Sequence, residues 1–216
     1  VLIHGSAAHP SEGERMAESA RILRMPVAED LSQASSGIAE HGIAYLPLAA
    51  MSHQIYALIA LYGLFEMRSP LNIAAHLLNP LGAAASLLGA SRAIYQTGPR
   101  DAAALLGWRD FAILSNKRDV AEATPYRATK LHRLINGSAA TTLLPSQPGP
   151  AAVQPIGLSS LEYWQSVWEG RVRDARPRQI VIDTAATALL TLERGEADAF
   201  SSMQKKAAAL WDGRQR

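Results

Sequence analysis

The sequence alternates short apolar strands with helices, and this alternation is the feature that most constrains the fold. Val1–Ile3 and Ile43–Leu46 predict buried strands, and a capping-box pattern from Ser11 to Glu14 opens the helical stretch between them. Strand, helix and strand joined by short loops are typical of a parallel sheet flanked by helices. We therefore expect an α/β fold with a mostly parallel sheet.

The alternation is interrupted once, by two consecutive apolar helices. The pattern predicts them over Ser52–Glu66 and Ser69–Leu78, the second with a serine cap and a first-turn proline. Because they carry too much apolar surface for loops, we expect a two-helix excursion belonging to a small all-helical lobe. An Asn-Pro bend then returns the chain to the sheet at Ala85–Ala90. The predicted organisation is a first part of the α/β domain over 1–50, the helical-lobe excursion over 51–82, and the rest of the α/β domain with C-terminal helices over 83–216.

The second half of the chain predicts further sheet and helix. A helix over Pro99–Leu106 leads to a strand at Phe111–Leu114, which is followed by a polar, charged loop over 115–127. Asn136-Gly137 is a strong turn signal between two strands. The remaining predicted segments are the strands Leu131–Ile135 and Thr141–Leu144 and the helices Ser159–Glu169, Arg178–Leu192 and Asp198–Asp212.

Composition limits the class of protein. With 216 residues and 48% apolar residues the chain can bury a large core, and without cysteine it can form neither disulfides nor thiolate metal sites. We expect a reducing compartment, the cytoplasm. The longest apolar run, Ile55–Phe65, is about half of the ~20 residues of a bilayer-spanning helix, so we expect no membrane span. Because VLIHG reads as an interior strand with no methionine before it, we also expect that an N-terminal portion is missing.

Polar residues follow two of the predicted strands at their carboxyl ends, where open α/β sheets bind ligands. His4, Gly5 and Ser6 lead from the first strand into a helix whose free N–H groups suit a phosphate. Asp119 and Glu122 lie in the polar loop and could hold Mg²⁺ together with substrate phosphates. The alternatives are an ordinary strand exit for the first group and a solvated charge cluster for the second.

A second candidate surface lies between two C-terminal helices. Four arginines crowd this segment, and Trp164 and Trp168 are spaced to share one helical face nearby. Phosphate attraction and base stacking by such residues bind single-stranded nucleic acid, although tryptophans at helical spacing are also typical of a core. The net charge of +2 is too small to indicate a nucleic-acid partner by itself. The four arginines are Arg171, Arg173, Arg176 and Arg178.

Three motifs in the middle of the chain resemble those of one enzyme family. Arg68-Ser69-Pro70-Leu71-Asn72 is similar to an Arg-Ser/Thr-x-x-Asn element, Leu77–Pro80 to Leu-Leu-Asn-Pro, and Leu87–Gly89 to Leu-x-Gly. With VLIHG and RQIVIDTAATALLTLERGEADAF, they make nearly the whole chain resemble the anthranilate phosphoribosyltransferase-like proteins, the family-3 glycosyltransferases. The resemblance implies that Leu77–Ser91 returns the chain from the helical lobe to the sheet. It also implies that the rest of this lobe and a glycine-rich diphosphate loop lie upstream.

Departures from the family pattern bear on function. Where the enzymes have Lys-His-Gly-Asn, this chain has Ile3-His4-Gly5-Ser6, which lacks the cation and the amide. The arginine that holds the anthranilate carboxylate is replaced by Tyr62 and Gly63, which cannot offer a bidentate fork. The family's adjacent Asp-Glu magnesium pair becomes the separated Asp119 and Glu122. We therefore predict that the chain is not a functional anthranilate phosphoribosyltransferase.

The resemblance implies a diverged family-3 glycosyltransferase-like protein. It would transfer a phosphoribosyl or pentosyl group from a phosphorylated sugar donor to an unknown nitrogenous acceptor, with Mg²⁺ at Asp119 and Glu122, and would form a homodimer through the helical lobe. One alternative is a non-catalytic nucleic-acid-binding protein on the same scaffold, and another is a structural relic whose helical lobe mainly makes a dimer. The expected donor-binding residues are His4, Gly5, Ser6, Arg68 and Asn72.

Overall fold

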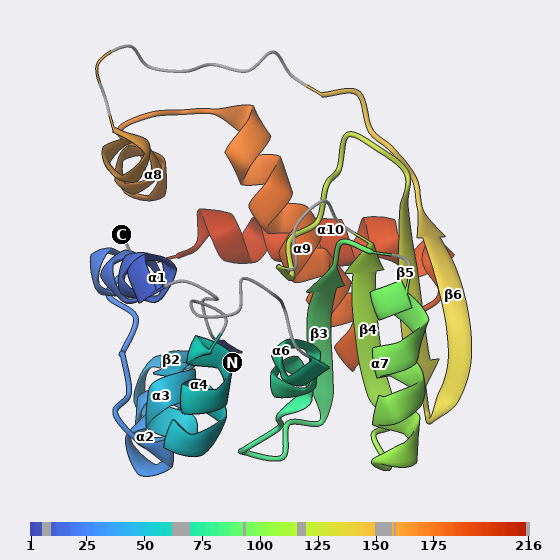
Figure 1. Cartoon of the computed structure of the whole chain (residues 1–216). Coiled ribbons are helices and arrows are strands. Elements are labelled where there is room, and N and C mark those ends of the chain that lie inside the picture. Colours follow the sequence, from blue (N-terminus) through green and yellow to red (C-terminus); the bar gives the residue numbers. More distant parts are fainter. Residues whose placement is uncertain are drawn as a thin grey trace. The chain divides into compact units, whose positions relative to one another are not determined.

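We describe a computed structural model of the chain over residues 1–5, 10–61, 70–92, 94–115, 120–149, 157 and 159–214. The chain forms two compact units, Val1–Ala83 and Ala84–Arg216 (Figure 1). Both contain strands and helices, and in both a parallel pair of strands is present, so the predicted α/β class is confirmed. No helix of the described residues is long and apolar enough to cross a membrane.

The first unit begins with the predicted strand, helix and strand. The two strands pair in parallel, with Ile3 opposite Tyr45 and Gly5 opposite Pro47. The side chain of Asp30 caps the intervening helix by accepting the Gln33 N–H at 2.8 Å, as is common at helix starts. The elements are β1 (Leu2–Gly5), α1 (Pro10–Ile22), α2 (Leu31–His41) and β2 (Ala44–Pro47).

Helices follow β2, and the described residues up to η1 contain no further strand, as the apolar pattern predicts; the end of the helix predicted over Ser52–Glu66 lies outside the described residues. The hydroxyl of Ser52 accepts the Ile55 N–H and caps the second of them. Leu48, Ile59 and Ala75 form a small buried cluster among them. The last turn before the Asn-Pro bend is a 3₁₀-helix rather than the predicted α-helix, since Leu78 N–H bonds to the Ala75 carbonyl three residues back. The elements are α3 (Leu48–Met51), α4 (His53–Ala60), α6 (Pro70–Ala74) and η1 (Ala75–Leu77).

The second unit is built on a four-stranded sheet in the order β3-β4-β5-β6. β3 (Ala85–Ala90) and β4 (Asp110–Ser115) are parallel, whereas β4–β5 and β5–β6 pair antiparallel. The predicted hairpin is confirmed, with Asn136 and Gly137 at φ of 52° and 83° in its turn. The other elements are α7 (Ile94–Leu105), β5 (Thr129–Ile135), β6 (Ser138–Leu144), α8 (Ser160–Trp168), α9 (Ala175–Leu192), η2 (Ala197–Ala199) and α10 (Phe200–Asp212).

Helices cover both faces of this sheet (Figure 1). Ala112 and Leu114 of β4 pack with Leu190 of α9 and Met203 of α10 in the largest buried cluster. Since side chains alternate along a strand, Ile113 points to the other face, which α7 covers. The parallel pairing of β3 and β4, which ends with Ala90 opposite Ser115, brings the carboxyl ends of these strands together.

Helix α7 corrects one sequence prediction. Pro99 was expected to open the helix, but the helix begins earlier, at Ile94, and contains this proline. The proline ring normally clashes with the Cβ of the residue before it and keeps that residue out of helical geometry. Gly98 has no Cβ, which removes this clash.

Candidate functional site

The loop after β4 packs against β3, where Val120 lies over Gly89. An ideal Cβ built on Gly89 would lie 1.7 Å from the carbonyl oxygen of Val120, so only glycine fits beneath the loop. The next residues form a tight turn, in which Glu122 N–H donates to the Val120 carbonyl at 2.8 Å. Ala123 N–H then donates to Thr184 Oγ1 on α9 at 3.0 Å. The loop is therefore anchored between β3 and α9.

Further bonds hold the rest of the loop. The Arg127 guanidinium donates to the carbonyl of Ser115, the last residue of β4, at 3.1 Å. The Tyr126 hydroxyl donates to the Arg176 carbonyl at 3.1 Å. Gln147 N–H donates to the Pro125 carbonyl at 2.7 Å. The backbone around Glu122 is thus fixed at the carboxyl end of β4, where the sequence predicted a ligand site.

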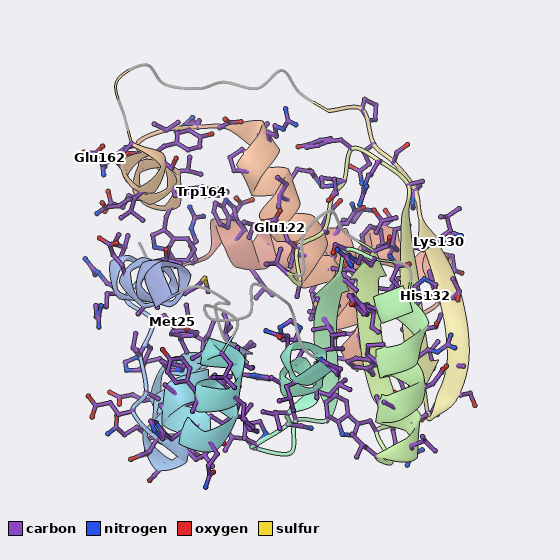
Figure 2. All side chains as sticks on the ribbon, in the orientation of Figure 1. Met25, Glu122, Lys130, His132, Glu162 and Trp164 are labelled. Atoms are coloured by element: carbon purple, nitrogen blue, oxygen red, sulfur yellow. The ribbon has the colours of Figure 1, made fainter. Side chains whose placement is uncertain are left out.

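Of the predicted magnesium pair, Glu122 lies in this anchored loop with an exposed side chain (Figure 2). Asp119 lies outside the described residues. Within the described part of the chain, no group of three or more histidine, aspartate or glutamate residues could hold a metal ion. Mg²⁺ commonly takes only one or two protein carboxylates and completes its shell with water and substrate phosphates, so Glu122 suits this role.

The other predicted donor site belongs to the first unit. His4 and Gly5 end β1, as expected, whereas Ser6 and Arg68 lie outside the described residues. Burial lowers the pKa of His4, and the neighbouring His76, which the sequence did not single out, lowers it further. The ring is therefore neutral at pH 7, and its buried Nδ1 has no hydrogen-bond partner in the described structure. Asn72 lies on α6 of the same unit.

The four arginines, two before α9 and two in its first turn, do not form one free basic patch. Arg171 pairs with Glu169 at 2.6 Å, and Arg178 pairs with Asp212 at 3.0 Å. Arg176 stacks its guanidinium over the Tyr126 ring, 5.2 Å from the centroid. Arg173 alone of the four is exposed with no partner among the described residues.

The two tryptophans predicted to share a face have different surroundings. Trp164 is 45% exposed (Figure 2), whereas Trp168 meets Trp211 of α10 edge to face, 5.7 Å between ring centroids. Arg214 stacks over both of the latter rings and donates to the Trp168 carbonyl at 2.9 Å. Trp168 therefore joins the ends of α8 and α10, and only Trp164 remains available for stacking on a ligand.

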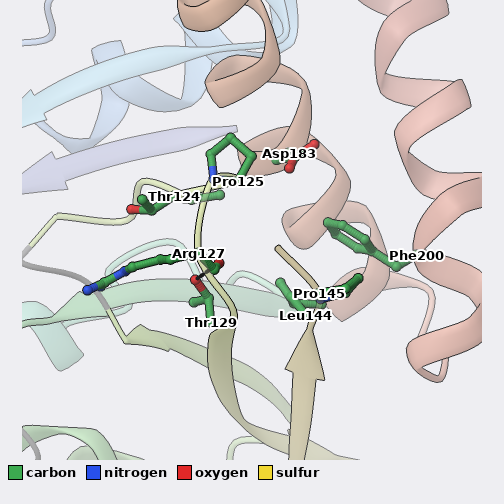
Figure 3. A pocket seen from close by; sticks show the side chains of 9 residues that line it. Thr124, Pro125, Arg127, Thr129, Leu144, Pro145, Asp183 and Phe200 are labelled. Atoms are coloured by element: carbon green, nitrogen blue, oxygen red, sulfur yellow. Dashed lines mark hydrogen bonds between the residues drawn. The ribbon is translucent and has the colours of Figure 1, made fainter. Parts of the chain in front are cut away.

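A small cleft lies behind the anchored loop, within the second unit (Figure 3). It is a small depression that opens to solvent. Asp183 of α9 lines it and is only 3% exposed. Asp183 was not identified from the sequence, although an acid among apolar residues of the predicted helix Arg178–Leu192 was a signal for this site. The other lining residues include Thr124, Pro125, Thr129, Leu144 and Phe200.

No family model and no curated protein matches the sequence. Among solved structures, the chain is similar to a variant of anthranilate phosphoribosyltransferase from Saccharomyces cerevisiae, solved with Mg bound. The TM-score is 0.63 at 14% sequence identity, and the match covers 96% of this chain and 68% of the yeast chain. At this identity the likeness concerns the fold. The resemblance seen in the sequence is confirmed at that level, and the chain has the fold of anthranilate phosphoribosyltransferase over nearly all of its length.

Proposed function

We propose that the protein is a diverged phosphoribosyltransferase-like enzyme that binds a phosphorylated sugar donor and transfers its pentosyl group to a nitrogenous acceptor other than anthranilate. The fold match over 96% of the chain carries this proposal. Glu122, held at the carboxyl end of β4, supports it because ligands of open α/β sheets bind at that edge. The missing arginine fork, replaced by Tyr62 and Gly63, argues against a carboxylate-bearing acceptor.

In this proposal the chain's own residues position the donor. Glu122 would hold Mg²⁺ from a backbone that needs no rearrangement, with Asp119 as a second carboxylate. His4, Gly5, Ser6, Arg68 and Asn72 are the proposed donor-binding residues. Since its ring is neutral at pH 7 and bonds to the Leu78 backbone, His4 would meet the sugar donor through Nδ1 as an uncharged hydrogen-bond acceptor. When bound, Mg²⁺ offsets the negative charge that develops on a diphosphate leaving group.

Replacing Glu122 with glutamine tests the metal site. We expect phosphoribosyl diphosphate with Mg²⁺ to raise the melting temperature of the unmodified protein, because a ligand at about 100 times its Kd stabilises the folded state by about 2.7 kcal/mol. Glu122→Gln should remove most of the magnesium-dependent part of this shift, as measured by differential scanning fluorimetry. Glu18→Gln, which changes an exposed carboxylate on α1, should leave the shift intact. A full shift in Glu122→Gln would contradict the assignment.

We also propose a homodimer formed through the helices of the first unit. Leu58 of α4 is 47% exposed, Leu61 is 43% exposed and Leu71 of α6 is 38% exposed. Helices α4 and α6 contact each other, and exposed apolar side chains that form a patch mark protein interfaces. Light scattering should give twice the monomer mass, and Leu58→Glu should reduce it to that of a monomer. A monomeric unmodified protein at micromolar concentration would contradict this proposal.

The alternative, a nucleic-acid-binding protein on the same fold, draws on Arg173 and Trp164. Both are exposed, so they could contact phosphate and stack on a base. Its basis is narrow, because Arg171 and Arg178 are already paired with acids. Retention of single-stranded DNA that falls with added salt and with Arg173→Ala would favour this function. No retention at low salt would eliminate it.

A further inference from the structure

Asp183 is a buried carboxylate with no role in the proposed transfer. Its Oδ1 accepts two amide hydrogen bonds, from Gln179 Nε2 at 2.7 Å and Gln204 Nε2 at 2.8 Å. No described residue donates to its Oδ2, and no cation among the described residues pairs with it. The carboxylate is therefore held in one orientation by one oxygen while the other keeps its full accepting capacity. Because Asp183 lines the cleft, a ligand there could use that oxygen (Figure 3).

Thr129 gives the cleft a second hydrogen-bond acceptor besides Asp183. Thr129 Oγ1 donates its proton to the Arg127 carbonyl at 3.2 Å, so toward other groups it can only accept. The Arg127 guanidinium donates to the Ser115 carbonyl and extends away from Asp183 in Figure 3. It is not among the groups that shift the pKa of Asp183, which burial raises and the two amides lower. The acid thus has no charge compensation from the cleft itself, an arrangement that costs free energy when ionised.

We propose that this cleft binds a compact organic cation that carries N–H donors, namely an alkylammonium or guanidinium group. The N–H groups would bond to Asp183 Oδ2 and Thr129 Oγ1. The rings of Pro125 and Phe200 give the site apolar surface, and an aromatic ring attracts a cation placed over its face. The cleft is small and opens to solvent, so only the head group itself would enter it while the rest of a larger molecule stayed outside. This site is independent of the proposed transferase function.

An NMR titration with small probes tests the charge and the donors separately. The Ala123 amide is a suitable reporter, because it donates to Thr184, the residue after Asp183. Methylguanidinium and ethylammonium should shift this signal and saturate at millimolar concentration. Methylurea, a neutral molecule of similar shape to methylguanidinium, and tetramethylammonium, a cation without N–H, should not. Saturation by methylurea at the same concentration, or no saturation by either donor cation, would overturn the proposal.

Asp183→Asn isolates the contribution of the carboxylate. The substitution keeps an oxygen for Gln179 and Gln204, so the fold should be retained, which a melting curve checks. Methylguanidinium should bind the variant at least about tenfold more weakly, the loss expected when a charge-assisted hydrogen bond becomes neutral. Asp198→Asn, at an exposed acid in η2, should bind as the unmodified protein does. Equal binding by Asp183→Asn would show that the carboxylate is not the ligand's partner.

The pH dependence gives a second measurement that needs no variant. Because burial raises the pKa of Asp183, its proton is taken up at a higher pH than by an exposed aspartate. Binding of methylguanidinium should therefore be complete above that pKa and be lost as the pH falls through it. In Asp183→Asn the remaining weak binding should not follow this titration. Binding unaffected by pH down to the ordinary aspartate range would also overturn the assignment.

Discussion

Replacing Gly89 with alanine is expected to lower the free energy of unfolding by about 3 kcal/mol, the upper range for inserting a methyl group into a packed site. The new Cβ would lie 1.7 Å from the Val120 carbonyl oxygen and 2.1 Å from its carbonyl carbon. Both are backbone atoms, so a side-chain rotation cannot relieve the clash. Gly89 is paired with Leu114 in the sheet, so the loop rather than the strand should move. Urea denaturation measures the change.

The matched control is Gly5→Ala. Gly5 also lies in a parallel strand, but a Cβ there would meet no atom of the described residues within 4 Å. Its effect on stability should stay within about 0.5 kcal/mol, as is usual where nothing is displaced. Gly89→Ala should also abolish the magnesium-dependent melting shift, because it dislodges Glu122. An unchanged urea midpoint in Gly89→Ala would mean that the loop tolerates displacement and that its anchoring is not needed for the site.

The elements that depend on neighbouring residues were predictable from the sequence. Asn136-Gly137 specifies its hairpin because both residues tolerate positive φ, and the structure confirms it. The helix predicted from Ser159 begins with a capping box in which Ser159 and Glu162 bond each other's backbone N–H. The strand-helix-strand start follows from alternating apolar runs. In each case the residues that set the structure lie within a few positions of one another.

Features that depend on distant residues were not predictable. Position 89 must be glycine because the backbone of Val120 packs against it, and Val120 follows α7 and β4 in the chain. The long helix α9 was expected to begin at Arg178, but it begins at Ala175, because Asp174 caps it and also accepts the Tyr163 hydroxyl. That bond and burial raise the pKa of Tyr163 to about 12. The cap itself is a local contact with the Arg176 N–H, whereas no local pattern in the sequence contains the Tyr163 bond or the Val120 contact.

The candidate site was predictable only in position. Open sheets bind ligands at the carboxyl ends of their strands, and His4, Gly5 and Glu122 lie at or beside the ends of β1 and β4. The likeness of fold adds no residue-level match at 14% identity. Asp183 was missed because its spacing on α9 fits a solvated helix face as well as a buried one. Its burial depends on the loop that covers it.

Arg133 has a role that only the structure reveals. Replacing it with methionine is expected to lower the free energy of unfolding by about 3 kcal/mol, because each hydrogen bond from a charged group contributes about 1.5–3 kcal/mol. The side chain is fully buried on β5. It donates to the carbonyls of Leu190 and Gly195, at 2.9 and 2.7 Å, at the end of α9. Helix ends leave such carbonyls unpaired, and a cation there is favoured by the helix dipole. Methionine fills similar space but leaves the Gly195 carbonyl without this donor, and it leaves the Leu190 carbonyl with the Gly195 N–H alone.

Two measurements separate this role from simple packing. Urea denaturation should show the loss in Arg133→Met, while Arg173→Met, at an exposed arginine, should change stability by less than about 0.5 kcal/mol. Hydrogen exchange of the Gly195 amide, which bonds to the Leu190 carbonyl at 3.0 Å, should speed up more than that of the centre of α9. Burial lowers the pKa of Arg133, so its desolvation opposes these bonds. Unchanged stability in Arg133→Met would mean that this desolvation cancels them, and that the end of α9 is held by packing alone.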